Sequence, residues 1–467
     1  MDTKIWQFRK TLLLVLGFFS LCANGWMFWT VWSQQYASTA NYYRNGYFVL
    51  FGLYVLLLFL ISYNNGAYRA GYFRVSELIF AHVTSLCLTN GVEYLQISLI
   101  DGRLVPVGGM LWLTLMQAVF AIFWSVLATR IYFLIYPPRK MVLVYQNDSD
   151  KYLIGKIHHR ADKYNIEDTI SIGEGMENVK KKILQYHAVV LSEMPDETRN
   201  ELMRFCFKND RRAYIVPSLT DIMLGNASTI NLFDTPLLLC RNRSLTYEQR
   251  LVKRTMDLVV SSVGIIVASP FMLIVALAVK LYDGGPVLFK QDRLTKDGKV
   301  FRLYKFRSMV VDAEKDGVAR LATQHDERIT PVGKFIRATR LDELPQLFNI
   351  FMGSMSLVGP RPERPEIAKQ YLEIMPQFDY RLKFKAGLTG YAQVMGKYNT
   401  TPQDKLTLDL MYIEGYSLLL DFKILLLTLK TIFVRESTEG IDEHATIADR
   451  PIEAAAEEND GKTGAKQ

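Results

Sequence analysis

Four long apolar stretches occupy the first third of the chain and constrain its fold more than any other feature. They span roughly residues 11–33, 46–64, 76–100 and 109–136. Each approaches the ~20 apolar residues that an α-helix needs to cross a bilayer. The third is less regular, because Asn90, Glu93 and Gln96 interrupt it. We therefore predict an α-helical membrane anchor of four helices over residues 1–140, with the lipid bilayer as a partner.

Charges at the ends of these stretches predict their orientation. The ends that should lie on one side of the membrane carry most of the basic residues: Lys4, Arg9, Lys10, Arg69, Arg74, Arg139 and Lys140. The two alternate loops carry one arginine each. Lysine and arginine accumulate in the cytoplasmic loops of membrane proteins. This bias predicts that the N-terminus and everything after residue 137 are cytoplasmic.

The composition argues against several other classes of protein. The 467 residues are 49% hydrophobic and 12% aromatic, which excludes a disordered chain. The net charge of +8 would suit a nucleic acid, but much of the excess lies beside the apolar stretches, so no nucleic-acid partner is expected. The four cysteines show no zinc spacing and no disulfide framework, as in a reduced, cytoplasm-facing protein.

Residues 141–245 are predicted to form a Rossmann-like α/β module. Short apolar runs alternate with polar segments that suit helices, which predicts a parallel sheet of MVLVY, HAVVLSE, AYIVP and PLLLC. A nucleotide would be expected at the first strand–helix turn, but YQNDSDKYLIG contains no glycine-rich loop. A regulatory or assembly role is therefore expected, and dimerisation through this module would give a homo-oligomer.

A fifth apolar segment, residues 256–280, is interrupted at its centre by Ser269 and Pro270. Proline removes a backbone hydrogen bond and kinks a helix. Basic residues flank both ends of the segment: Lys253, Arg254, Lys280, Lys290 and Arg293. A simple crossing would put one basic cluster outside, whereas a re-entrant helix bent at Ser269-Pro270 keeps both in the cytoplasm. The charges favour the re-entrant helix over an ordinary kinked crossing.

The last apolar run, residues 416–434, contains Asp421, Lys423 and Lys430, which suits a helix lying in the membrane interface. The tail over residues 440–467 is polar and alanine-rich and is expected to be disordered.

Two adjacent carboxylates, Asp342 and Glu343, lie in the stretch TRLDELPQLFNIFMGSMSLVGPRPE of residues 339–363. Consecutive residues on a helix point about 100° apart, so the pair does not suit a proton shared across a substrate. The pair could instead have two different roles, in which one carboxylate attacks the substrate as a nucleophile and the other binds a metal or directs a proton transfer. The structural alternative is that Asp342 caps a helix, with Pro345 in the first turn.

Cations crowd around these acids: Lys299, Arg302, Lys305, Arg307, Arg337, Arg340, Arg361 and Arg364. So many guanidinium groups suit a polyphosphate, because arginine grips phosphate oxygens with two parallel hydrogen bonds. A divalent ion such as Mg²⁺, bound by a carboxylate and the phosphates, would offset the negative charge. The reactants would then be a soluble pyrophosphate compound and a component of the membrane.

At this point the chain resembles a known family. Residues 247–436 are similar to the bacterial sugar transferases, the monotopic polyprenyl-phosphate phosphoglycosyl transferases. The matching motifs, in the family's order, are KRTMDLVVSSVGIIVASP, GGPVLFKQDRLTKDGKVFRLYKFRSM, RLDELPQLFNIFMGSMSLVGPRPE, KAGLTGYAQV and LLLDFKILLLTLKTI. The resemblance implies a mixed α/β monotopic catalytic domain with a re-entrant membrane helix. The anchor and the module before it resemble the long members that begin exopolysaccharide or capsule repeat units, similar to undecaprenyl-phosphate glucose and galactose phosphotransferases.

The resemblance also implies a reaction and roles for residues. Members transfer a hexose 1-phosphate from a UDP-sugar to undecaprenyl phosphate and release UMP. Asp342 would be the nucleophile that forms a phosphosugar–enzyme intermediate, and Glu343 would complete the dyad, with both placing Mg²⁺. The residues expected to bind substrate are Arg293, Lys305, Arg307, Arg337, Arg340 and Arg361. The protein would be a multi-pass protein of the bacterial inner membrane, with its catalytic domain facing the cytoplasm.

The sequence departs from the family in one motif. Many members have GLTGWAQVNGR, whereas here Tyr391, Met395 and Lys397 replace the tryptophan, the asparagine and the arginine. Contacts to base or sugar cannot be carried over there, and glucose or galactose is the default expectation for the hexose.

Two alternatives belong to other functional classes. A conventional membrane glycosyltransferase would move a sugar without its phosphate, and it would normally show an Asp-x-Asp metal motif. A non-catalytic scaffold or transporter for polysaccharide assembly would place polar groups inside its membrane helices. Here the cationic motifs lie in the soluble third of the chain.

Overall fold

The computed structural model describes residues 8–37, 46–147, 150, 152–158, 160, 162–240, 245–311, 328–396 and 401–433. The chain divides into two compact units, Met1–Pro217 and Ser218–Gln467. The tail predicted to be disordered, residues 440–467, lies outside the described residues.

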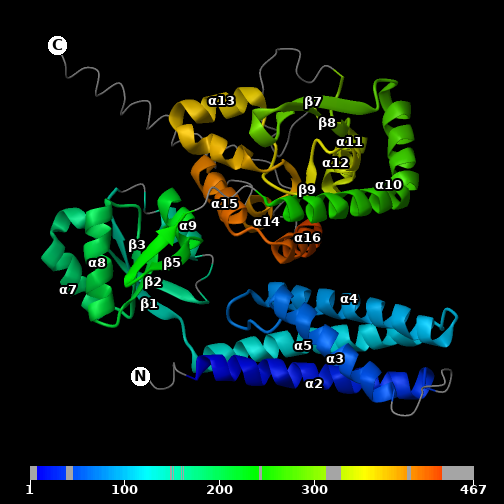
Figure 1. The fold of residues 1–467 in the computed structure, drawn as a ribbon, viewed down its shortest axis with the longest axis horizontal. Helices are drawn as coiled ribbons and strands as arrows, with labels where there is room; N and C mark the ends of the chain where they lie inside the picture. Colours follow the sequence, from blue (N-terminus) through cyan, green and yellow to red (C-terminus); the bar gives the residue numbers. More distant parts are fainter. Residues whose placement is uncertain are drawn as a thin grey trace. The chain divides into compact units, whose positions relative to one another are not determined.

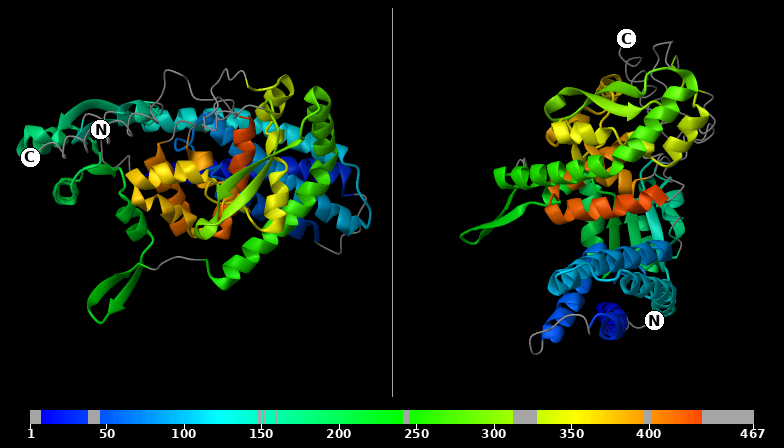
Figure 2. Two further views of the ribbon diagram at one scale, coloured as in Figure 1. Left: turned by 90° about the horizontal axis from the view of Figure 1, so that it is seen from above. Right: turned by 90° about the vertical axis from the view of Figure 1, so that its right-hand side faces the viewer.

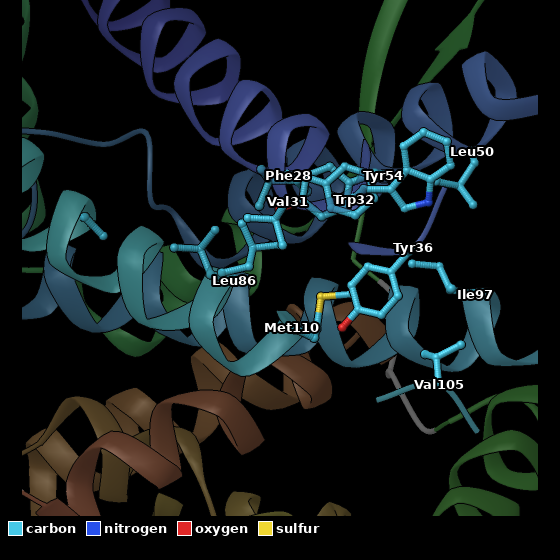
Figure 3. Close-up of a cluster of buried hydrophobic side chains, with 13 residues drawn as sticks. Phe28, Val31, Trp32, Tyr36, Leu50, Tyr54, Leu86, Ile97, Val105 and Met110 are labelled. Carbon is cyan, nitrogen blue, oxygen red and sulfur yellow. The ribbon is translucent and has the colours of Figure 1, made fainter. Parts of the chain in front are cut away.

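The first unit opens with four long apolar helices (Figure 1). They are α2 (Arg9–Gln35), α3 (Gly46–Asn65), α4 (Val75–Asp101) and α5 (Gly108–Ile135). By length and composition each could cross a membrane. Figure 3 shows part of their shared core, where the rings of Phe28 and Tyr54 stack with centroids 3.8 Å apart. The four helices agree with the sequence prediction.

Two of the polar residues that make the third stretch irregular, Asn90 and Glu93, face the inside of the bundle. Asn90 and Glu93 are buried in α4, whereas Val92, Leu95 and Leu99 on the same helix are exposed. The Asn90 side chain donates to Gln117 and to Thr114 at 2.8 Å and accepts from the Tyr54 hydroxyl at 3.2 Å. Hydrogen bonds between helices stabilise membrane bundles, so these polar residues, together with the buried Leu86 and Ile97 of the same helix, join α4 to its neighbours.

A four-stranded parallel sheet follows the bundle. Its strands are β1 (Arg139–Tyr145), β2 (Tyr164–Ser171), β3 (Ala188–Leu191) and β4 (Arg212–Ile215), in the order β2-β1-β3-β4. Helices α7 (Met176–Gln185) and α8 (Asp196–Lys208) pack on the face that carries Val142 and Val144. Helix α6 (Tyr152–His158) covers the face of Met141 and Leu143. The alternating apolar residues of β1 are therefore buried on both faces, as is usual for parallel sheets.

The sheet differs from the prediction at two strands. The run PLLLC does not join it, because β6 (Thr235–Leu239) pairs antiparallel with β5 (Ser228–Leu232) in the second unit. The sheet instead gains β2, whose sequence YNIEDTIS is too polar to be recognised as a strand. Before the hairpin, α9 (Leu219–Gly225) buries Ile222 in the core of the second unit.

The second unit arranges short elements around one long helix, α10 (Tyr247–Asp283). An antiparallel ribbon of β7 (Leu288–Leu294) and β8 (Val300–Phe306) follows, and β9 (Ser356–Val358) pairs in parallel with β10 (Gly387–Thr389). The remaining elements are η3 (Lys296–Gly298), α11 (Pro331–Ala338), η4 (Leu341–Glu343), α12 (Gln346–Met352), α13 (Pro365–Ile374), η5 (Pro376–Lys383), α14 (Tyr391–Met395), α15 (Pro402–Glu414) and α16 (Leu418–Phe433). The unit is therefore a mixed α/β domain, as predicted.

Helix α10 is bent into two arms (Figures 1 and 2). The sharp bend agrees with Pro270 inside the helix. Because Pro270 has no N–H group, the carbonyl of Ile266 lacks its usual partner, and the Ser269 hydroxyl donates to that carbonyl at 2.8 Å. Around the bend, apolar side chains are exposed, among them Val263, Ile266, Val267, Phe271, Leu273 and Ile274. The serine thus satisfies one of the groups that the proline frees, within a surface suited to lipid.

The bent helix leads to a testable prediction about topology. Cysteines placed at Arg250 and Lys290, in a variant without the native cysteines, should both react with a membrane-impermeant reagent from one side of the membrane. Replacing Ser269-Pro270 by Ala-Leu should straighten the helix and give part of the population opposite-side labelling, because an unbroken apolar helix is long enough to cross. If the two cysteines were labelled from opposite sides in the protein that keeps Ser269-Pro270, the re-entrant helix would be ruled out.

Candidate active site

The carboxylate dyad lies in a tight turn between two helices. After α11 the backbone reverses at Arg340, which adopts a left-handed conformation (φ 57°), and η4 then carries Asp342 and Glu343. Leu341 and Leu344, on either side of the dyad, pack into an apolar cluster of the second unit. The capping alternative is wrong, because α12 begins after Pro345 without a side-chain cap. The turn instead places two neighbouring carboxylates in different surroundings.

Glu343 is held by a lysine. The Lys305 ammonium on β8 lies 3.0 Å from Glu343 Oε1, and Arg340 lies 3.9 Å from the same oxygen. Burial alone would raise the pKa of the Glu343 carboxyl, but Lys305, Arg361 and Arg340 more than offset it and lower this pKa to about 2. Glu343 is therefore an anion at neutral pH.

Asp342 is 8% exposed and has a different environment. Within the described part of the chain, its carboxylate has no hydrogen-bond or ion-pair partner. Burial raises its pKa, the Glu343 charge acts in the same direction, and Lys305, Arg337 and Arg340 oppose both. Asp342 is therefore a buried carboxylate without a hydrogen-bond partner among the described residues, in the field of nearby cations.

The loop Gly359–Glu363, which contains Arg361, is fixed through its backbone. Each carbonyl from Pro360 to Glu363 accepts a hydrogen bond at 2.9–3.0 Å; the donors, in order, are Gly387 N, Arg381 Nη2, Arg293 Nη1 and Leu294 N. The Arg361 side chain is exposed, and its charge lowers the pKa of Glu343. The loop is therefore rigid and leaves one guanidinium group available beside the dyad.

Two of the other arginines predicted to bind substrate are engaged with the protein itself. Arg293 donates to Pro362 O at 2.9 Å and to the side chain of Gln291, and burial, followed by repulsion from Arg361, lowers its pKa to about 10. Arg307 is buried and pairs with Asp283. Of the predicted set, the structure brings Lys305, Arg337, Arg340 and Arg361 around the dyad, and Arg293 behind the loop.

Sequence reasoning missed a buried ion cluster behind the loop. The Arg381 guanidinium lies 2.7 Å from Asp409 and 3.4 Å from Glu363, and all three side chains are largely buried. Burial raises the pKa of Asp409 to about 6, although Arg381 opposes the shift. Arg381 and Asp409 belong to none of the motifs quoted for the family, so no signal in the sequence marked them.

The motif that departs from the family lies partly in the core. Tyr391 opens α14 and packs against the main apolar cluster of the second unit. Met395 ends the same helix and is exposed. Lys397 lies outside the described residues.

The dyad fits a divalent metal only in part. Within the described residues no group of three or more histidine, cysteine or acidic side chains could hold a metal ion. Asp342 has both oxygens available, and Glu343 has one oxygen beside Lys305. Mg²⁺ is commonly held by one or two carboxylates together with substrate phosphates, so the dyad suits a metal that arrives with a polyphosphate.

A comparison with known protein families finds a match within the second unit. Residues 248–435 match the sequence model of the family described as bacterial sugar transferase. A UDP-glucose:undecaprenyl-phosphate glucose-1-phosphate transferase of Klebsiella pneumoniae is 41% identical over 228 residues, which cover 48% of this chain and 47% of that protein. An undecaprenyl-phosphate galactose phosphotransferase of Salmonella typhimurium is 37% identical over 242 residues, 48% of this chain and 50% of that protein.

A third relative shares more of the chain. A UDP-N-acetylgalactosamine-undecaprenyl-phosphate N-acetylgalactosaminephosphotransferase of Aeromonas hydrophila is 34% identical over 284 residues, 59% of this chain and 64% of that protein. The matched part of the chain thus spans about half to two thirds of the length of these relatives.

The fixed loop leads to a prediction about Gly359. A Cβ atom there would meet the backbone oxygen of Lys385, which cannot move without disturbing the β9–β10 pair. Gly359→Ala should therefore lower the Tm of the purified protein by roughly 3–10 °C, the range expected for overpacking at a rigid contact. Gly225→Ala is the matched control, because a Cβ there meets nothing within 4 Å. Equal Tm values for the two variants would contradict the rigid loop.

Proposed function

Because residues 248–435 match the bacterial sugar transferases, we propose that this protein transfers a hexose 1-phosphate from a UDP-sugar to undecaprenyl phosphate and releases UMP. The observation that carries the proposal is the dyad: a buried Asp342 without a partner beside a Glu343–Lys305 pair. The names of the relatives support both substrates. Glucose or galactose is the proposed hexose, and the product would begin an exopolysaccharide or capsule repeat unit.

In the first step an oxygen of Asp342 attacks the phosphorus that bears the sugar. A bond forms between this oxygen and phosphorus, the bond from phosphorus to the nucleotide's bridging oxygen breaks, and UMP leaves with the electron pair. The result is a phosphosugar–Asp342 intermediate. Attack by an anion on a pyrophosphate requires cations that reduce the repulsion, and Lys305, Arg337 and Arg340 all act on Asp342.

In the second step an oxygen of undecaprenyl phosphate attacks the same phosphorus. The acyl-phosphate bond breaks, Asp342 is regenerated as a carboxylate, and undecaprenyl-diphosphate-hexose forms. Arg361, on its rigid loop, would bind the nucleotide phosphates through its exposed guanidinium group in the first step. The loop's fixed backbone limits the movement of this group between the two steps.

The acceptor is a lipid, so the site must lie at a membrane surface. UDP-sugars are cytoplasmic, and we propose that the re-entrant helix keeps the catalytic domain on the cytoplasmic face of the bacterial inner membrane. If this helix crossed the membrane instead, Asp342 would lie on the opposite side from the cytoplasm, where no UDP-sugar is available. Polar groups unpaired in lipid are costly, which supports a role for the Ser269 hydroxyl bond at the bend.

A screen of the purified protein against several UDP-sugars tests the reaction. Release of UMP supports the proposal; release of UDP would indicate a conventional glycosyltransferase, and release of neither would indicate a scaffold. Asp342→Asn keeps the size of the side chain but removes the attacking charge, so turnover should fall by at least ~10³-fold, about 4 kcal/mol of barrier. Wild type with UDP-sugar alone should give a phosphosugar adduct on the peptide that contains Asp342. An active Asp342→Asn variant would exclude this nucleophile.

We also propose that Mg²⁺ binds with the donor, held by Asp342, Glu343 and phosphate oxygens. When bound, the ion would neutralise charge on the transferred group. Excess EDTA should therefore stop UMP release, and added Mg²⁺ should restore it. Glu343→Gln should raise the Mg²⁺ concentration needed for half-maximal rate. Undiminished turnover in EDTA would remove the metal from the proposal.

A further inference from the structure

Each arm of the bent helix α10 carries one carboxylate that contacts a segment leading to the active site. Asp257 lies on the first arm, and Asp283 ends the second. Neither was predicted as a site residue, and neither is placed in the chemistry above. Their contacts link the membrane helix to the two halves of the site.

Asp257 is bound to the strand that leads into the Arg361 loop. The residue is 3% exposed, and its Oδ1 accepts from Leu357 N at 2.9 Å and from Ser356 Oγ at 3.1 Å. Both donors belong to β9, which continues directly into Gly359. A buried charge is stable only when donors satisfy it, so Asp257 fixes this strand to the first arm.

Asp283 is bound to the strand that carries Lys305. Its Oδ1 pairs with the Arg307 guanidinium and also accepts from Gly285 N at 3.2 Å. Arg307 follows directly after β8, where Lys305 holds Glu343. The other terminal nitrogen of Arg307 is buried without a hydrogen-bond partner, so within the described residues Asp283 is the charged group that orients this guanidinium.

Apolar contacts reinforce the second link. Val275 and Val279 on the second arm are buried with Phe306 of β8 and Ile336 of α11. Leu341 and Leu344, which flank the dyad, pack against the same cluster.

The first arm also contacts the chain after the dyad, because Arg254 donates to the carbonyls of Ile350 and Phe351 at the end of α12. The site is therefore attached to both arms.

We propose that Asp257 and Asp283 are positioning residues, which fix the Arg361 loop to one arm of α10 and the Lys305–Arg307 strand end to the other. The bend at Ser269-Pro270 then sets the distance between the Arg361 guanidinium group, which would bind the donor phosphates, and the dyad. This inference rests on the proposed reaction, because it assigns Arg361 to donor binding and the dyad to bond formation. A displacement of about 1 Å at a reacting centre can cost ~10²-fold in rate.

The test separates donor binding from chemistry. Four quantities are measured: KM for the UDP-sugar, the rate of adduct formation at saturating donor, the amount of adduct formed, and Tm. The amount of adduct gives the fraction of protein molecules that are active, so that the rate can be expressed per active molecule. Asp257→Ala should raise KM roughly 10-fold with a smaller change in the adduct rate per active molecule. The reason is that the Arg361 loop would shift, whereas Asp342 and Glu343 would keep their positions. Asp257→Asn keeps an acceptor for both donors and should restore KM to within about 3-fold of wild type.

Asp283→Ala should have the opposite pattern. The adduct rate per active molecule should fall roughly 10–100-fold with little change in KM, because Arg307 loses its charged partner among the described residues and the end of β8 is released. Asp292→Ala is the matched control, since Asp292 is an exposed β7 carboxylate 3.8 Å from Arg302, and both parameters should stay at wild-type values.

Milder variants keep the test decisive if the alanine variants do not fold. Ser356→Ala removes one donor to Asp257 and should raise KM alone. Gly285→Ala places a Cβ against the Arg307 guanidinium and should lower the adduct rate alone. Lower Tm and amplitude with wild-type KM and rate per active molecule in all variants would overturn the positioning role. A wild type that releases no UMP from any UDP-sugar would instead overturn the proposed function.

Discussion

The structure of the second unit depends on a proline inside its longest helix. A straight α-helix of 37 residues would extend about 55 Å and could not keep both of its ends against one small domain. The bend lets Asp257 contact β9 while Val275 and Val279 pack beside the dyad. The Ser269 hydroxyl compensates one carbonyl that Pro270 leaves unpaired. A single local defect therefore determines where both halves of the site can lie.

Charge balance is the second constraint. The site places two adjacent carboxylates among several cations, and the two acids differ because their surroundings differ. Glu343 has a lysine at 3.0 Å and a low pKa, whereas Asp342 is buried without a partner and has a raised pKa. Behind the site, Arg381, Glu363 and Asp409 form a buried cluster that fixes the Arg361 loop from within. Removing one member would leave another buried charge uncompensated, which is costly.

The three reported relatives act on different sugars by their names: glucose, galactose and N-acetylgalactosamine. Tyr391 packs against the main apolar cluster of the second unit, within the range of residues 248–435 that matches the bacterial sugar transferase model. Under the proposed function, the cations around the dyad would bind the diphosphate of the donor, whichever hexose it carries.

The sequence by itself determined the features that follow from local patterns. Runs of about twenty apolar residues gave the four N-terminal helices, Pro270 marked the bend, and the adjacent acids with their arginines marked the candidate site, which lies within the range that matches the bacterial sugar transferase model. It failed where local pattern and final environment disagree: polar YNIEDTIS became a strand because β1 offered it an edge, and apolar PLLLC formed a hairpin outside the sheet. Only the tertiary structure decided which arginines face the dyad, because Arg293, Arg307 and Arg361 look alike in sequence yet two of them are engaged by protein acceptors. The physical reason is that a guanidinium's role depends on which carbonyls and carboxylates lie within about 3 Å, and here those partners come from segments up to about seventy residues away in the chain.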